Sequence, residues 1–143
     1  MKYLVWLVLF SLASTSAFSD HHELNLEAKQ SRTELNITSI QLGEDLSIVT
    51  AEGETGEYGR VYVTYYLNYD RDGSAGSFTM QGRGYVDTDT IFSGSGAGRW
   101  TRDGHLVRLT QILTISDGSQ NLDVIVIDPL NRTLIADLYA LRN

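Results

Sequence analysis

Residues 76–100 read GSFTMQGRGYVDTDTIFSGSGAGRW, and glycine recurs at every second position in two clusters of this stretch. The clustered glycines are Gly82, Gly84, Gly94, Gly96 and Gly98. Because alternate residues of a β-strand point to the same face, each cluster leaves one face of a strand without side chains. A glycine in a strand costs stability, so it marks a bend, a bulge or a close approach by another group. The stretch therefore predicts two strands of a strongly curved antiparallel sheet.

Period-two alternation continues on both sides of this stretch. Residues 60–69 show it most clearly, with valine, leucine and tyrosine on one face and two further tyrosines on the other. Short turns rich in Asp and Gly separate the segments. We predict strands at residues 34–42, 46–51, 60–69, 77–86, 91–102, 105–115, 121–127 and 133–141, with an acidic loop at residues 52–57.

A meander of so many short strands has to hide its two edges, and closure into a barrel hides them completely. The predicted fold class is therefore all-β: a closed antiparallel barrel of about eight or nine strands with little helix. A barrel of about eight strands encloses either packed side chains or a cavity for one small ligand.

The first nineteen residues have the pattern of a secretory signal peptide. Lys2 precedes an apolar run, and Ala17 and Ser19 are small residues that suit cleavage before Asp20. Cleavage after Ala17 is the alternative. The apolar run is shorter than the ~20 residues of a membrane-spanning helix. We expect residues 1–19 to be a signal peptide and residues 20–143 to form a single β-barrel domain, periplasmic or secreted and without a membrane anchor.

The charge of the predicted mature chain excludes several kinds of partner. It keeps all 18 acidic residues but, without Lys2, 10 of the 11 basic ones, which gives a formal net charge of −8. That sign disfavours nucleic acids and anionic lipid surfaces. The chain has no cysteine, so it has neither disulfides nor a thiol nucleophile and must rely on its core for stability. Because the glycine stretch lacks the Gly-Lys-Ser/Thr ending of a phosphate loop, we expect no nucleotide there and assign no cofactor.

Two histidines near the predicted cleavage site form a conditional metal site. If the mature chain begins at Asp20, His22 is its third residue and follows His21. The free amine, two backbone amides and the His22 imidazole then supply square-planar nitrogen ligands, which suit copper(II) or nickel(II). Cleavage after Ala17 places both histidines beyond the third position and removes the site.

Two carboxylates interrupt otherwise apolar strands, namely Asp123 and Asp137. A carboxyl inside a barrel has a raised pKa and can act as a general acid or base. The alternative is that each points outward or pairs with an arginine such as Arg108 or Arg132, and the rarity of buried charged side chains favours this alternative. The catalytic residues, if there are any, stay unassigned.

The order of features between residues 65 and 112 resembles the central part of the allene oxide cyclase and dirigent-like barrel superfamily. An aromatic strand with Tyr65, Tyr66 and Tyr69 precedes an Asp-Gly turn, and the segments FTMQGRGY at 78–85, DTDTIFSGSGAG at 87–98 and GHLVRLTQI at 104–112 follow. The resemblance implies an eight-stranded antiparallel barrel with an apolar cavity. Members are cyclases of hydrophobic epoxides, dirigent proteins that guide radical coupling, or bacterial proteins of unknown role, and many are dimers or trimers, so a homo-oligomer is implied. No catalytic residue is carried over, because the cyclase's functional carboxylate and amide lie in parts of the barrel that do not align here.

Three hypotheses of function follow. The first is an exported binding module for a small apolar or aromatic molecule; the second is a cyclase or isomerase of the allene oxide cyclase type; the third is a non-enzymatic interaction or assembly protein. A cavity distinguishes the first two from the third, and a buried carboxylate in that cavity favours the enzyme. Aromatics at these spacings are more often plain core, but they are the candidates for a ligand lining: Tyr65, Tyr69, Phe78, Tyr85, Phe92 and Trp100.

Overall fold

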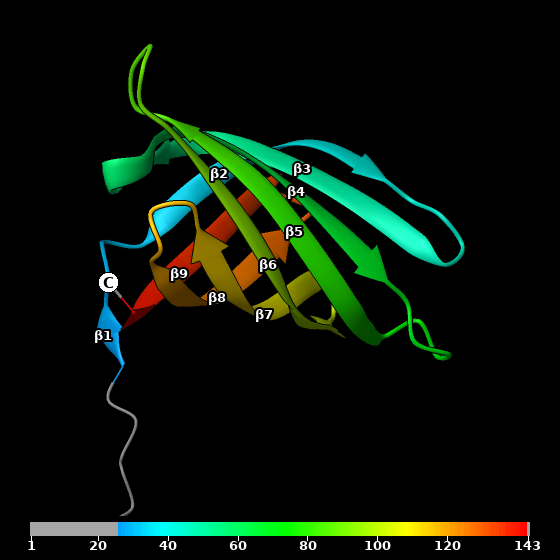
Figure 1. Ribbon diagram of the computed structural model, residues 1–143. Coiled ribbons are helices and arrows are strands. Elements are labelled where there is room, and N and C mark those ends of the chain that lie inside the picture. Colours follow the sequence, from blue (N-terminus) through cyan, green and yellow to red (C-terminus); the bar gives the residue numbers. More distant parts are fainter. Residues whose placement is uncertain (1–25, 143) are drawn as a thin grey trace, which may run out of the picture.

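A computed structural model describes residues 26–142 as a single antiparallel sheet (Figure 1). A short 3₁₀ helix, η1 (Gly56–Tyr58), joins two of the strands. No helix among the described residues is long and apolar enough to span a membrane. The strands are β1 (Glu27–Ala28), β2 (Thr33–Gln41), β3 (Leu46–Thr55), β4 (Gly59–Asn68), β5 (Ala75–Tyr85), β6 (Ile91–Asp103), β7 (Leu106–Ile115), β8 (Gln120–Asp128) and β9 (Thr133–Arg142).

The sheet closes on itself to form an eight-stranded barrel from β2 to β9. Each of these strands pairs antiparallel with the next, and β9 pairs with both β8 and β2. Ala136 of β9 lies opposite Ile125 on one side and Thr33 on the other, which completes the ring. The two-residue strand β1 lies outside the ring beside the end of β9 (Figure 1). The prediction of a closed antiparallel barrel with little helix is confirmed.

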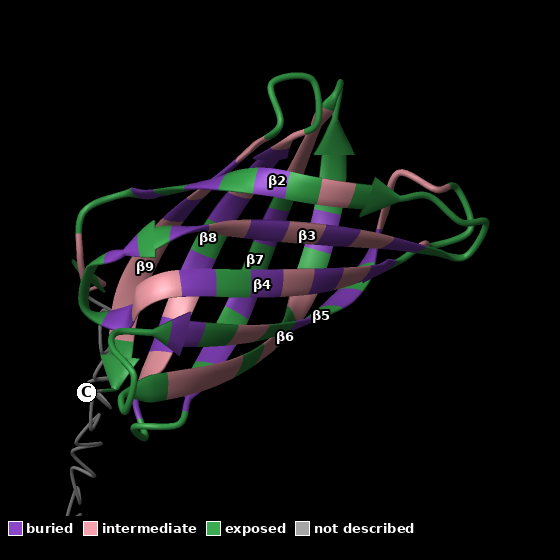
Figure 2. Ribbon diagram, turned by 90° about the horizontal axis from the view of Figure 1, so that it is seen from above, coloured by how far each residue is buried: buried purple, intermediate pink, exposed green. Residues whose placement is uncertain are grey.

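Burial alternates along the strands, as the period-two pattern requires (Figure 2). In β4, Val61, Val63 and Tyr65 are buried inside the barrel, whereas Tyr62 on the opposite face is 49% exposed. The inward positions of the eight ring strands supply one continuous core. The barrel interior is therefore built mainly from valine, leucine, isoleucine and aromatic side chains.

The glycine clusters lie side by side on β5 and β6 and face the interior. Gly82 pairs with Gly94, and the even positions of both strands point inward. At Gly98 a Cβ atom would lie 1.8 Å from the carbonyl oxygen of Thr110 on β7, and at Gly96 it would lie 2.6 Å from Oε1 of Gln111. The missing side chains thus allow β7 to approach β6 closely, as expected of glycine in a strand.

One loop prediction was wrong. Residues 52–57 were expected to form an acidic loop, but β3 continues to Thr55 and only η1 interrupts the chain before β4. Glu52 and Glu54 point outward and both pair with Arg60 of β4, at 3.1 and 3.7 Å. Gly53 and Thr55 alternate with them and are buried. The acidic residues are therefore the outer face of a strand.

Large aromatic side chains fill one end of the barrel. The rings of Tyr69 and Trp100 meet edge to face at a centroid distance of 5.4 Å, and those of Tyr65 and Phe78 lie 6.0 Å apart. The indole nitrogen of Trp100 donates a hydrogen bond to the carbonyl of Asn68. Open space lies toward the opposite end of the barrel, where β2, β4, β6 and β8 begin.

Candidate functional site

The interior toward that opposite end encloses a cavity of about 90 Å³. Its walls come from β2 to β9 and from the segment just before β2, and most of the lining side chains are apolar. The apolar residues include Leu35, Val61, Val63, Tyr65, Met80, Phe92, Leu113, Ile115, Leu134, Ala136 and Leu138. Gly82, Gly84 and Gly94 form part of the same wall, so the glycine stripe contributes directly to the open space.

Among residues 26–142, Asp123 is the one acidic residue that lines this cavity. It lies on the inward face of β8 and is 3% exposed. Gln111, its partner on β7, donates a 2.8 Å hydrogen bond from Nε2 to Oδ2 of Asp123. Within the described residues Oδ1 has no hydrogen-bond partner. Of the two alternatives for this residue, the structure shows the interior one.

Burial raises the pKa of Asp123 to about 6, although the hydrogen bond from Gln111 and the charge of Lys29 act in the opposite direction. Tyr65 lines the same cavity, and its pKa is raised by burial and by the negative charge of Asp123. The phenol is therefore neutral at any physiological pH. Further unpartnered polar atoms lie nearby on the same two strands, namely Oε1 of Gln111 and both amide atoms of Asn121.

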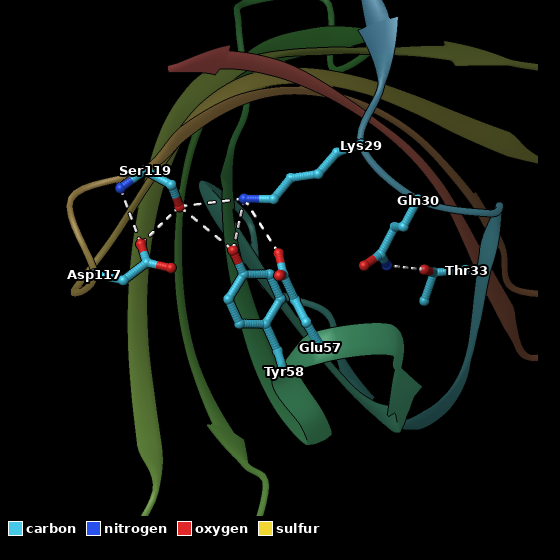
Figure 3. A network of polar contacts seen from close by, with 7 residues as sticks. All are labelled: Lys29, Gln30, Thr33, Glu57, Tyr58, Asp117 and Ser119. Carbon is cyan, nitrogen blue, oxygen red and sulfur yellow. Dashed lines mark hydrogen bonds and ion pairs between the residues drawn. The ribbon is translucent and has the colours of Figure 1, made fainter. Parts of the chain in front are cut away.

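A network of polar side chains lies at this end of the barrel (Figure 3). The Lys29 ammonium donates hydrogen bonds to the Tyr58 hydroxyl at 2.7 Å and to Oγ of Ser119 at 3.3 Å, and it lies 3.4 Å from a carboxylate oxygen of Glu57. Ser119 in turn donates to Asp117 from both its hydroxyl and its backbone N–H. The network thus links the chain before β2 with η1 and with the turn between β7 and β8.

The network fixes the ionisation of its members. Burial alone lowers the pKa of Lys29, but the hydrogen bond to Tyr58 and the neighbouring Glu57 more than compensate, so its pKa is raised and the ammonium stays charged. The pKa of Tyr58 is raised by burial, against the hydrogen bonds from Lys29 and Ser119. The Tyr58 ring packs edge to face against Phe92, a cavity-lining residue, at 5.2 Å. Tyr58 also lines the cavity, so the Lys29 ammonium contacts a residue of the cavity wall.

A local irregularity of the backbone places Lys29 there. Glu27 pairs with Ala140 and Thr33 pairs with Ala136, so the chain of β1 and β2 carries two residues more than β9 over the same length. The surplus forms a bulged segment, residues 29–32, which we call the strap. The Lys29 N–H still bonds the carbonyl of Leu138, which anchors the strap to β9. Gln30 of the strap lines the cavity and donates to Thr33 at 2.8 Å.

The six aromatic candidates are placed in three different ways. Tyr65 and Phe92 line the cavity. Tyr69, Phe78 and Trp100 face the interior but belong to the packed end. Tyr85 is a correction: it is 43% exposed and packs against Tyr62 on the outer surface. It occupies an odd position of β5, and only the even positions of that strand face inward.

Of the remaining candidates, those that the structure describes lie away from the cavity. Asp137 faces outward and accepts two hydrogen bonds from Arg32, at 2.8 and 2.7 Å, a partner that the sequence did not indicate. Arg108 instead pairs with Asp103. His21 and His22 lie outside the described residues, and within residues 26–142 no group of three His, Cys, Asp or Glu side chains could hold a metal ion.

Sequence reasoning missed four polar residues of this end of the barrel. Gln111 and Asn121 lie in strands whose side chains alternate between the two faces, and both occupy the inward face. The alternation of these strands is the sequence feature that could have identified them. Lys29 and Tyr58 lie in irregular segments, where alternation gives no information about direction.

Comparison with protein-family models, with curated proteins and with solved structures finds no match to this chain. The resemblance of residues 65–112 to the allene oxide cyclase and dirigent-like superfamily stays a prediction.

Proposed function

We propose that the protein is an exported binding module that holds one small, largely apolar molecule in the barrel cavity. The observation that carries the proposal is the cavity itself, about 90 Å³ of open space with apolar walls and a single buried carboxylic acid. Ligand sites in proteins combine apolar walls with a few polar groups in this way. Since one water needs about 10–15 Å³ and a cavity of ~150 Å³ holds benzene, the space suits a ligand of at most roughly six non-hydrogen atoms.

The unfilled space and the unpartnered polar atoms both carry a cost in the empty protein. Native interiors contain few voids larger than a water molecule. A buried oxygen without a hydrogen-bond partner costs about 1–3 kcal/mol. The opposite end of the same barrel is filled by Phe78, Trp100 and Leu109, each of which is at most 3% exposed. A ligand that fills the cavity and partners Asp123 would offset both costs.

A second candidate function is supported by the same carboxyl. A pKa of about 6 for Asp123 lies near the values that suit proton transfer at neutral pH. A substrate bound in the cavity would bring a reacting C–H or O–H group against this residue. The second candidate is therefore an isomerase or cyclase in which Asp123 is the general acid or base. Turnover that Asp123→Asn abolishes without loss of binding would favour it over simple binding.

The proposed binding function is tested by blocking the cavity. Ala136 lines the cavity, whereas Ala97 of β6 is exposed on the outer face. Ala136→Leu and Ala97→Leu therefore make the same chemical change inside and outside the barrel. In native mass spectrometry of protein purified from its source, we expect a co-purified small molecule on the unaltered protein and on Ala97→Leu, and none on Ala136→Leu. An adduct of equal abundance on both variants, or no adduct on the unaltered protein, would contradict the proposal.

A further inference from the structure

We propose that the ligand is a small protonated amine with a short aliphatic body, whose ammonium group pairs with the Asp123 carboxylate. This inference rests on the proposed binding function, because it names the chemistry of the molecule that the cavity holds. It follows from the charges around the cavity, from the hydrogen-bonding state of the carboxyl and from the walls.

Asp123 has no cationic partner of its own among the described residues. Arg83 is the one basic residue that lines the cavity, but its side chain is exposed and its Nη1 donates to the carbonyl of Gly82. The Lys29 ammonium is already engaged by Tyr58, Ser119 and Glu57. A buried carboxylate without a counter-ion is unfavourable, and an opposite charge beside it removes much of that cost. The barrel therefore lacks a positive charge at this position, and an ammonium group supplies one.

The hydrogen bonds at Asp123 also favour a donor ligand. Gln111 holds Oδ2 with a bond of 2.8 Å, while Oδ1 has no partner within residues 26–142. An ionised carboxylate only accepts hydrogen bonds, and an ammonium group only donates them. Bonds between two such groups are shorter and about twice as strong as those between neutral groups. An anion would instead meet the negative charge of Asp123.

The walls define the rest of the molecule. Val63, Met80, Leu113 and Leu134 line the cavity and offer no strong hydrogen-bonding side-chain groups, so an alkyl chain suits them. At about 10–15 Å³ per water-sized group, an amine of roughly six non-hydrogen atoms fits. 3-Methylbutan-1-amine has this size, and its neutral and anionic counterparts are 3-methylbutan-1-ol and 3-methylbutanoate.

The pairing makes binding depend on pH. An alkylammonium group stays protonated below pH ~10, as lysine does. The other titratable and charged groups at the cavity include Tyr65 on β4 and Tyr58 on η1, whose raised pKa values keep them neutral. Arg83 of β5 lines the cavity as well, and Lys29 on the strap stays charged. Among the described residues that line the cavity, Asp123 is the one that changes charge between pH 5 and 7.5, with a pKa of about 6. The affinity for the amine is therefore expected to be about tenfold weaker at pH 5, where about a tenth of the carboxyl is ionised.

The test is isothermal titration calorimetry of the full-length exported protein with the three compounds at both pH values. Asp123→Asn removes the charge and keeps an oxygen to accept from Gln111, and Asp137→Asn removes an outward-facing, half-buried carboxylate as its control. We expect the amine to bind at least about tenfold more tightly than the alcohol at pH 7.5, as one charge-assisted bond requires. The preference should disappear in Asp123→Asn and persist in Asp137→Asn.

The outcomes separate this inference from the function on which it rests. The amine proposal is contradicted if the alcohol or the carboxylate binds more tightly than the amine. It is also contradicted if the amine binds equally at both pH values and in Asp123→Asn. Neither result contradicts the proposed binding function. If none of the three compounds binds, the amine proposal is contradicted. The native mass spectra described above then test the proposed binding function independently. The pH dependence is measured on the unaltered protein, so the test does not depend on the folding of a variant.

Discussion

Asp123 brings a carboxyl into a mostly apolar interior, and the free energy of that burial depends on pH. Its pKa is raised to about 6 by burial, so between pH ~4 and ~6 the folded protein holds a proton that the unfolded chain has lost. The free energy of unfolding therefore falls as the pH rises through this window, and the loss is complete above it. A shift of about two units corresponds to at most about 3 kcal/mol.

Replacing Asp123 by asparagine should remove this loss. We expect Asp123→Asn to be more stable than the unaltered protein at pH 7.5, with an advantage of up to about 3 kcal/mol that disappears near pH 4. The ionised Asp137 carboxylate stabilises the folded protein, since the hydrogen bonds from Arg32 lower its pKa. Asp137→Asn should therefore be less stable than the unaltered protein at pH 7.5. Urea unfolding at the two pH values measures both. If the difference in free energy of unfolding between Asp123→Asn and the unaltered protein does not change with pH, burial does not raise the pKa of Asp123.

Two glycines of the stripe should respond differently to a methyl group. At Gly98 a Cβ would meet the Thr110 carbonyl at 1.8 Å, a backbone atom that cannot move without separating β6 from β7. At Gly82 its nearest neighbour would be a Val63 methyl group at 3.2 Å, with the Tyr62 carbonyl oxygen at 3.4 Å in ordinary van der Waals contact. We expect Gly98→Ala to lower the free energy of unfolding by about 3 kcal/mol and Gly82→Ala by less than about 1 kcal/mol. Equal effects in thermal or urea unfolding would show that the close approach at Gly98 is absent.

Alternation predicts which residues share a face, but it does not say which face lies inside. The valine-rich face of β4 and the glycine face of β5 and β6 turn inward together, and this places Tyr85 outside although it is as apolar as Tyr65. For the same reason, the sequence did not show which of Asp123 and Asp137 points into the barrel. Their directions depend on the register with β7 and with the strap, which involves partners about 12 and 105 residues away in the chain.

The strap illustrates a limit that applies to irregular segments. Alternation in the sequence does not predict the strap, because a surplus of two residues against β9 leaves no pattern within the segment itself. Its position depends on contacts with η1 and with the turn after β7, which are far apart in sequence. Apart from β1 and the end of β3, the strands have boundaries close to the predicted ones, since their turns carry recognisable Asp and Gly residues.

Removal of the Lys29 ammonium should loosen the strap. Lys29→Met keeps the apolar stem but loses the hydrogen bonds to Tyr58 and Ser119, which are worth about 1–2 kcal/mol together. We expect hydrogen exchange of the Lys29 amide, which bonds Leu138, to accelerate by about tenfold, because 1.4 kcal/mol corresponds to a factor of ten. Arg108→Met, which breaks an exposed ion pair with Asp103 on the outer surface, is the matched control. Equal protection of the strap in both variants would show that the network does not hold it.

Closure of the barrel leaves β9 with partners on both edges. Its first residues pair with β2, its last with β1, and its whole length with β8. Amides along both β2 and β9 should therefore exchange as slowly as those of β5 and β6 in the middle of the sheet order. Exchange mass spectrometry that finds β2 or β9 unprotected would indicate an open sheet. The closed ring was predictable from the number of strands, whereas the place of the cavity was not, since it depends on where the large aromatic side chains of β4, β5 and β6 meet.

The titration of the Asp123 carboxyl, followed by carbon-13 NMR with and without 3-methylbutan-1-amine, tests the central claim most directly. The claim is that the barrel interior is a ligand cavity built around one buried acid. We expect a pKa of about 6 in the free protein and a value lower by at least about one unit with saturating amine, because an adjacent positive charge favours the ionised form. An ordinary pKa near ~4 in the free protein, or a raised pKa that the amine leaves unchanged, would contradict the account.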